Sequence, residues 1–274
     1  MRLANVAITG AALLTLCGSA HAQEKVAPLK FPFRDPSRPG VLHVGLVRGS
    51  IIVRGGNTKE VIVVARGRAE ERNPESRAGG LRQLAQQPAL DVTEENNRME
   101  IGSPNWGGGR AADLEIEVPA HTDLKLSTVN EGDVEVDGVE GELEIGNVNG
   151  SITLTRVKGS VVAHTVNGAV HATILQVTAQ QPMAFTSLNG TVEVSLPSTI
   201  KTNLKLRSDN GNVYTDFDLQ MLPETSAPVV EESRRPGGRY QVKVNKVIHG
   251  AVNGGGPEIE VRTFNGDVYV RNLK

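Results

Sequence analysis

Apolar and polar residues alternate along most of this chain, and glycine interrupts the alternation at a fixed interval. Between residues 132 and 168 a glycine stands at every ninth position, namely at Gly132, Gly141, Gly150, Gly159 and Gly168. Nearly all residues two and four positions after each glycine are aliphatic, as Ile152 and Leu154 are after Gly150. Alternation with a period of two predicts strands with one buried face, and a fixed repeat predicts short units that stack on one another.

The same pattern relative to glycine occurs outside this segment. Ile51 and Val53 follow Gly49 at the same offsets. Similar strands follow three later glycines, which are Gly190, Gly211 and Gly266. The intervals that connect Gly150, Gly168, Gly190 and Gly211 are 18, 22 and 21 residues. We therefore predict an 18-residue unit of two strands, with short loop insertions in the later units.

Asn-Gly begins alternate units, whereas the units between them begin with Glu140-Gly141 and Lys158-Gly159. The Asn-Gly pairs are Asn149-Gly150, Asn167-Gly168, Asn189-Gly190, Asn210-Gly211 and Asn265-Gly266. Glycine adopts positive φ without steric cost, and asparagine tolerates it better than most residues. We therefore expect one corner of each unit to be a turn at which asparagine stacks on asparagine, with neighbouring strands about 4.8 Å apart.

These features favour an all-β, β-helix-like solenoid of two-strand units. An antiparallel β meander or sandwich with Asn-Gly hairpins is the alternative, because it would bury the same valines. The pattern relative to glycine is the same in every strand. A meander would reverse alternate strands and mirror their pattern, so the coiled arrangement is the better prediction.

Residues 1–22 are typical of a signal peptide. Arg2 precedes a short apolar run over residues 6–16, and Ala20-His21-Ala22 has the small residues of a cleavage site. The run is shorter than the roughly 20 residues that a transmembrane helix needs. Cys17, the single cysteine, lies inside this segment. We expect an exported protein, periplasmic or secreted, with no transmembrane span and no disulfide.

The rest of the chain divides by composition. Residues 23–39 are rich in proline and charge and predict an extended lead-in. Residues 40–274 predict a single β-repeat domain, with loop insertions at 66–87 and 223–238 where charge, proline and glycine break the alternation. Aromatic residues make up 3% of the chain, and 29 basic residues balance 31 acidic ones. A balanced charge without a basic, aromatic-rich stripe argues against nucleic acid as a partner.

The repeat resembles a known family once these motifs are placed together. Strict alternation over residues 114–119 leads into Gly-x-Val-x-Val and Val-x-Gly-x-Ile repeats, with Val-Asn-Gly at alternate units. This is similar to a bacterial β-strand-repeat family of unknown function whose members are commonly labelled "putative adhesin". The resemblance covers roughly residues 40–274 apart from the two insertions. It implies a solenoid-like protein of the cell envelope, and it brings no catalytic residues.

Acidic and histidine residues are the candidates for metal binding. Asp133, Glu135 and Asp137 lie on one face of a predicted strand, and Glu142 and Glu144 lie on the next. Carboxylate oxygens suit Ca²⁺, although a solvated strand face explains the same alternation better. His164 and His171 lie in neighbouring strands at different offsets from glycine and need not meet. We therefore expect no metal and no cofactor.

Three functions are compatible with this sequence. The leading hypothesis is a non-enzymatic envelope protein, an adhesin or a scaffold that binds an envelope polysaccharide or a surface protein. Trp106, in a glycine-rich loop, and the Glu142/Glu144 face are its candidate ligand contacts. A polysaccharide lyase or hydrolase on a β-helix scaffold is the second hypothesis, which would need paired carboxylates beside a cleft with basic partners. An architectural module whose end strands pair with a partner protein is the third.

Overall fold

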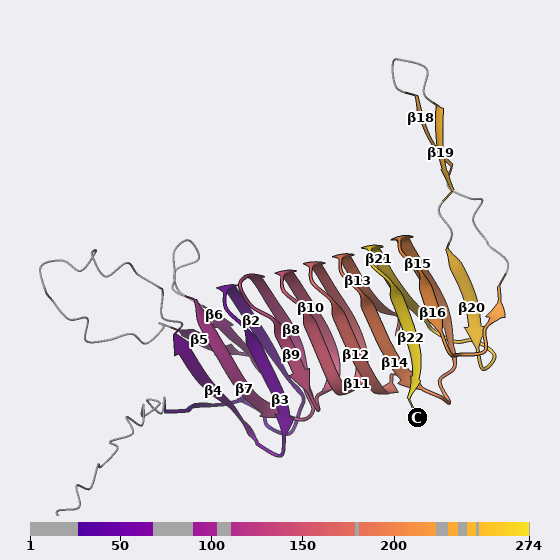
Figure 1. Ribbon diagram of the computed structural model, residues 1–274. Helices are drawn as coiled ribbons and strands as arrows, with labels where there is room; N and C mark the ends of the chain where they lie inside the picture. The colour runs from indigo at the N-terminus through magenta and orange to yellow at the C-terminus, as the bar shows by residue number, and fades with distance from the viewer. Residues whose placement is uncertain are drawn as a thin grey trace, which may run out of the picture.

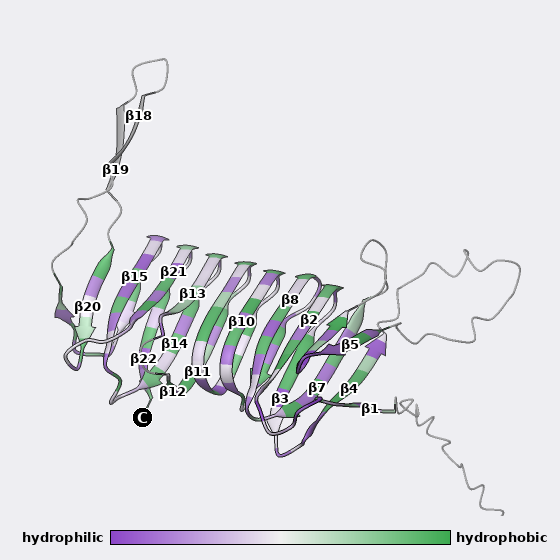
Figure 2. Cartoon of the chain, turned by 180° about the vertical axis from the view of Figure 1, so that it is seen from behind, coloured by the Kyte–Doolittle hydropathy of each residue, from purple (hydrophilic) through white to green (hydrophobic). Residues whose placement is uncertain are grey.

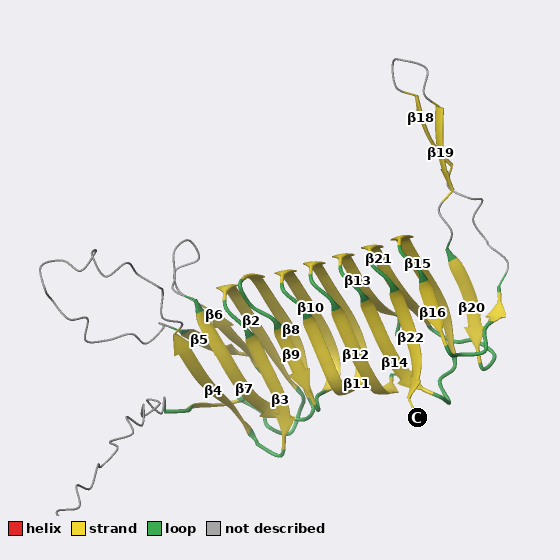
Figure 3. Cartoon of the chain, in the orientation of Figure 1, coloured by secondary structure: helices red, strands yellow, loops and turns green. Residues whose placement is uncertain are grey.

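The computed structural model describes residues 27–67, 90–102, 111–178, 181–222, 230–234, 240–244 and 247–273. The regular secondary structure in these ranges is β-strand throughout (Figure 3), so the prediction of an all-β chain is confirmed. The predicted signal peptide, Cys17 and Trp106 lie outside the described residues. Within them, no helix is long and apolar enough to cross a membrane.

Twenty of the strands belong to one continuous sheet that folds into two layers (Figure 1), and the other two, β18 (Val230–Arg234) and β19 (Tyr240–Val244), pair with each other in a separate sheet. Layer A contains, in spatial order, β5 (Asp91–Glu95), β6 (Arg98–Gly102), β2 (Gly40–Arg48), β8 (Thr122–Asn130), β10 (Glu140–Asn149), residues 158–167 of β11 (Ile152–Asn167), β13 (Met183–Asn189), β21 (Glu258–Asn265), β15 (Thr202–Asn210), β20 (Ile248–Val252) and β17 (Gln220–Met221). Layer B contains β1 (Leu29–Pro32), β4 (Glu60–Gly67), β7 (Ala112–Pro119), β3 (Ile51–Gly56), β9 (Val134–Asp137), residues 152–157 of β11, β12 (Val170–Val177), β14 (Val192–Pro197), β22 (Val268–Leu273) and β16 (Val213–Thr215).

We call two successive strands that connect the layers through a corner a rung. Neighbouring rungs pair in parallel in both layers, and in the central rungs the paired residues are 18 positions apart, as Asn149 and Asn167 are in layer A and Ile152 and Val170 are in layer B. The interval therefore equals the predicted length of the unit. β11 passes from one layer to the other as a single strand, and its register with β12 shifts where it bends at Arg156, which has a φ of 52°.

The rungs do not stack in the order of the sequence. From one end to the other the order is 98–119, 40–56, 122–137, 140–155, 158–177, 183–197, 258–273 and 202–215. The predicted arrangement, in which later units simply continue the array, is therefore wrong at residues 202–215. β21 and β22 lie between that rung and the rung of β13 and β14.

Antiparallel strands close the array at its ends. β4 pairs with β7 and β1 pairs with β4 at one end of layer B, while β5 pairs with β6 in layer A. At the other end β20 pairs with β15 and β17 pairs with β20. β1 lies within the predicted lead-in. β18 (Val230–Arg234), which pairs with β19 (Tyr240–Val244), lies within the predicted 223–238 insertion, so neither segment is loop throughout.

Aliphatic side chains from both layers fill the space between them. The alternation of hydrophobic and hydrophilic residues along each strand is visible in Figure 2, and the inward positions after the corner glycines are buried, as the pattern predicts. Val134, Val136, Ile152 and Leu154 are each at most 1% exposed. The interior is one continuous cluster that includes Phe33 and Phe185 among mostly Val, Ile and Leu residues. Small β-branched side chains suit such a thin core, because they pack well on a pleated surface.

We expect Leu143→Asp to unfold the array. Leu143 is 2% exposed and pairs with Leu124 and Val161 on the neighbouring rungs, so its replacement would bury an unpaired carboxylate. The cost should exceed about 4 kcal/mol, from lost apolar burial together with desolvation of the charge. Ser127→Asp is the matched control, because Ser127 is exposed on the outer side of the adjacent strand. Chemical denaturation followed by circular dichroism would measure both, and equal midpoints would contradict the inward placement.

Candidate binding surfaces

Neighbouring rungs approach each other closely at the Asn-Gly corner. A Cβ atom at Gly168 would overlap the carbonyl oxygen of Gly150, and one at Gly190 would overlap that of Gly168. Among the described residues, five non-glycine positions have positive φ, and none is one of the five asparagines at this corner. The predicted backbone role of these asparagines is therefore wrong. The close approach of neighbouring rungs requires glycine at this corner, whereas the asparagine contributes through its side chain.

The five asparagines form a hydrogen-bonded ladder along this corner, together with Asn130. Each side-chain Nδ2 donates to the Oδ1 of the asparagine on the neighbouring rung. The pairs are Asn149 to Asn130 at 3.0 Å, Asn167 to Asn149 at 2.8 Å, Asn189 to Asn167 at 2.8 Å, Asn265 to Asn189 at 2.7 Å and Asn210 to Asn265 at 2.9 Å. The ladder follows the spatial order of the rungs, so Asn265 lies between Asn189 and Asn210.

A second polar ladder, which the sequence analysis missed, lies just inside the corner. Two positions before each asparagine of the first ladder, an inward polar side chain donates to the glycine carbonyl of the neighbouring rung. The donors are Thr128 to Gly49, Asn147 to Gly132, Thr165 to Gly150, Ser187 to Gly168, Thr263 to Gly190 and Ser208 to Gly266, at 2.7–3.0 Å. The recurrence of Thr, Ser or Asn two residues before the corner asparagine was the available signal.

An apolar stripe runs along the outside of layer A beside the asparagine ladder. Each member of the stripe stands one residue before an asparagine of the ladder, except the member at one end, which stands before Arg48. The members are Val47, Val129, Val148, Val166, Leu188 and Phe264. Leu188 is 46% exposed and Phe264 37%. On the rung of β15 the equivalent residue is Asp209, which forms an ion pair with Arg207 at 2.6 Å. The stripe therefore extends over six consecutive rungs.

The predicted acidic candidates are not brought together. Glu135 and Asp137 lie on β9 in layer B, whereas Glu142 and Glu144 lie on β10 in layer A. The expectation that the second strand joins the first in one acidic group is wrong, because β9 ends one rung in layer B and β10 begins the next rung in layer A. Among the described residues, no group of three or more histidine, cysteine and acidic side chains is arranged to hold a metal ion.

Cations or amides already engage most of these carboxylates. Glu144 forms an ion pair with Lys125 at 2.9 Å, and Asp137 pairs with Arg156 at 2.5 Å. Glu142 accepts a hydrogen bond from Gln181 at 2.6 Å. His164 and His171 also lie in opposite layers, and His171 Nδ1 is 3.7 Å from Glu193. Ion pairs and hydrogen bonds of this kind are typical of solvated strand faces.

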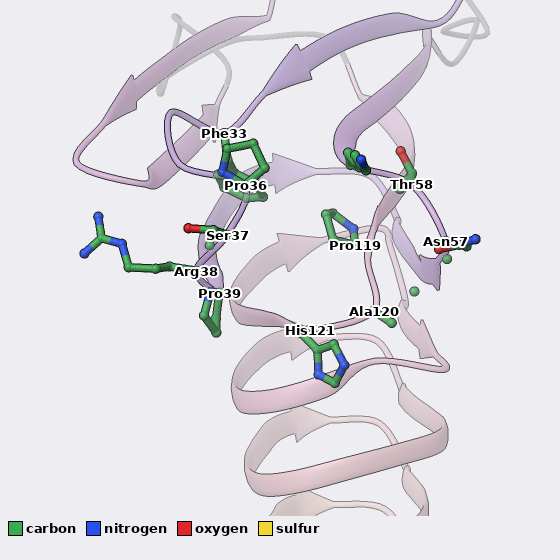
Figure 4. A pocket seen from close by; sticks show the side chains of 14 residues that line it. Phe33, Pro36, Ser37, Arg38, Pro39, Asn57, Thr58, Pro119, Ala120 and His121 are labelled. Carbon is green, nitrogen blue, oxygen red and sulfur yellow. The ribbon is translucent and has the colours of Figure 1, made fainter.

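A groove of about 560 Å³ lies near the end of the array that β1, β4 and β7 close (Figure 4). Its walls are the segment from Phe33 to Gly40, the turn from Gly55 to Lys59, and residues 119–121. Three prolines in this lining carry no backbone N–H to pair, which helps to keep the walls apart. Among its described lining residues there is no carboxylate, so the paired acids of glycoside hydrolysis are not in this groove.

Two tyrosines stack on the outside of layer B at the opposite end. The rings of Tyr214 on β16 and Tyr269 on β22 have centroids 4.9 Å apart and planes 11° apart. The Arg271 guanidinium lies 5.4 Å from the centroid of Tyr269 and pairs with Glu193 at 2.5 Å. The Tyr269 hydroxyl donates to Asp267 at 3.2 Å. Desolvation, followed by the charge of Asp267, raises the pKa of Tyr269, so this hydroxyl remains protonated at neutral pH.

Comparison with known proteins shows similarity to one family and to several solved structures, two of which are described here. The family model described as Toastrack DUF4097 matches residues 111–271, more than half of the chain. A putative cell adhesion protein from Clostridium sporogenes ATCC 15579 is 13% identical, with a TM-score of 0.44 over 90% of this chain and 100% of that one. A putative adhesin from Bacteroides fragilis NCTC 9343 is 10% identical, with a TM-score of 0.28 over 91% and 98%. No curated protein matches.

We expect Asn167→Ala to cost about 1 kcal/mol of unfolding free energy, because Asn167 donates to one neighbour in the ladder and accepts from another. Asn210→Ala is the control, since its described ladder contact is the single bond to Asn265 and its loss should cost about half as much. Urea unfolding of both variants would measure the difference. Equal costs for the two variants would show that the second ladder bond of Asn167 adds nothing to stability.

Proposed function

Since the chain belongs to the Toastrack DUF4097 family, which is of unknown function, we propose a function from its own surface. The protein is an exported, non-enzymatic scaffold of the cell envelope that binds an extended surface polymer or a surface protein along its array. The adhesion that gives similar proteins their names is one such activity. The features of residues 1–22 support export.

The rungs in this proposal form one β-solenoid. Parallel pairing between rungs in both layers supports it, as does the 18-residue register of the central pairs. Such an arrangement repeats each outward side chain at the strand spacing of about 4.8 Å. A partner with its own short repeat, such as a polysaccharide or an extended peptide, can then make the same contact on several rungs.

The observation that carries the proposal is the apolar stripe beside the asparagine ladder. Six consecutive rungs place an apolar residue at the same outward position, which gives a stripe about 24 Å long from the first to the last. Exposed apolar residues are common singly, but a continuous row with a polar rim is typical of an interaction site. Covering this surface would contribute about 25 cal/mol per Å² of apolar area.

The test is binding of residues 23–274 to an array of glycans and envelope fragments. We expect saturable binding by the parent chain. A double variant, Leu188→Ser with Phe264→Ser, should bind about tenfold more weakly, which corresponds to about 1.4 kcal/mol of lost contact.

Leu175→Ser provides the matched control, because Leu175 is 43% exposed but lies on β12 in layer B, away from the stripe. Its binding should equal that of the parent. If the parent chain binds nothing on the array, the proposal is wrong. If the stripe variant and the control variant lose the same amount of affinity, the contact lies outside the stripe.

We expect no cleavage of acidic or neutral polysaccharides by the same chain, with or without Ca²⁺. Reducing-end and ultraviolet assays of a broad polysaccharide panel would detect hydrolysis and lysis respectively. Product formation from any member, lost on replacement of a carboxylate, would favour the enzyme over the scaffold.

A further inference from the structure

The two stacked tyrosines lie where layer B stops. β16, which carries Tyr214, pairs with β22 and, among the described strands, with no other. Tyr269 covers one face of the Tyr214 ring, yet Tyr214 is 47% exposed. The exposed surface therefore includes the face of the ring that points beyond the array, where a further rung would have placed its own side chain.

Polar groups of fixed orientation surround this aromatic pair. Glu193 holds the Arg271 guanidinium, and Asp267 accepts from the hydroxyl of Tyr269 and from the backbone N–H of Asn212. A second carboxylate, Asp216, accepts from the backbone N–H of Asn272 at 2.7 Å. The site thus combines a flat apolar face with both donors and acceptors at its margin, which is the composition of a small-ligand site.

We propose that Tyr214, supported by Tyr269, is a stacking platform for a neutral pyranose ring of an envelope glycan. The proposal rests on the scaffold function above and names a ligand class for it. The C–H face of a sugar carries partial positive charge and packs on the negative face of an aromatic ring. The sugar would take the place of the side chain that a further rung would add beside Tyr214, and its hydroxyls would remain free to form hydrogen bonds at the margin of the ring.

Charge and shape distinguish a neutral sugar from other ligands. Glu193 neutralises the Arg271 guanidinium, and two further carboxylates, Asp216 directly after β16 and Asp267 directly before β22, leave net negative charge for an acidic sugar to meet. A quaternary ammonium ion is best bound by a cage of several rings, whereas Tyr214 offers one open face. A neutral ring with equatorial hydroxyls leaves its C–H face free for stacking and suffers neither disadvantage.

The chain contains three tyrosines, which makes the platform directly observable. We would label the tyrosine rings with ¹³C and titrate residues 23–274 with chitotetraose, with oligogalacturonate as the acidic probe and tetramethylammonium as the cationic one. Chitotetraose should shift the Tyr214 signals strongly and those of Tyr269 weakly. Tyr240, on β19 in the separate two-stranded sheet, serves as an internal reference and should not move.

Variants distinguish stacking from a structural role of the ring. Tyr214→Phe keeps the aromatic face and should bind chitotetraose within about threefold of the parent, whereas Tyr214→Ser should lose at least tenfold. Thermal unfolding of each variant checks that the array is intact, and Leu175→Ser should bind as the parent does.

No shift of Tyr214 with chitotetraose would overturn the platform, as would a shift with tetramethylammonium or oligogalacturonate alone. Equal affinity of Tyr214→Ser and the parent would also overturn it. If glycan-array binding persists in Tyr214→Ser but is lost in the stripe double variant, the scaffold function stands and the platform is wrong. If the parent binds neither the array nor chitotetraose, both proposals are wrong.

Discussion

The separation of neighbouring rungs at the Asn-Gly corner is the constraint on which the array depends. Backbone carbonyls approach there to a distance that excludes any Cβ, and two sets of side chains exploit that approach. Outside, asparagine amides bond to one another, and inside, Thr, Ser or Asn donates to the glycine carbonyl. Because a buried carbonyl needs a hydrogen-bond partner, the inner donors satisfy the glycine carbonyls of the corner as the chain turns.

Strand positions and burial followed from the sequence because they depend on local alternation. Ile152 and Leu154 had to face inward whatever lay beside them, and the same holds after the other corner glycines except Gly211, in the last rung, where Thr215 is exposed. The order of the rungs was not predictable from the sequence. β21 presents to β13 and β15 the same kind of side chains, at the same register positions, that these two strands would present to each other. A repeat whose units are nearly identical specifies how units stack but not which unit stacks on which.

The candidate site residues also divide into those that a local sequence pattern predicts and those that depend on contacts between distant segments. Asn167 and Asn189 were found because their spacing is regular, although the reason first assigned to asparagine, a left-handed backbone, was wrong. Glu135 and Glu144 were grouped from their proximity in sequence, but the corner between β9 and β10 places them in opposite layers. Tyr214 and Tyr269 were missed because their contact depends on the inserted rung, which no local pattern reveals.

The insertion of β21 and β22 between earlier rungs also affects how the molecule is made. The rungs of β13–β14 and β15–β16 leave the ribosome before residues 258–273 exist, yet they cannot contact each other in the final arrangement. Until that later segment arrives, two parallel edges remain open, and premature pairing between them would have to be undone. Completion of the array is therefore a late, non-local step. Such steps are slow because closing a long loop costs conformational entropy before any new contact stabilises the chain.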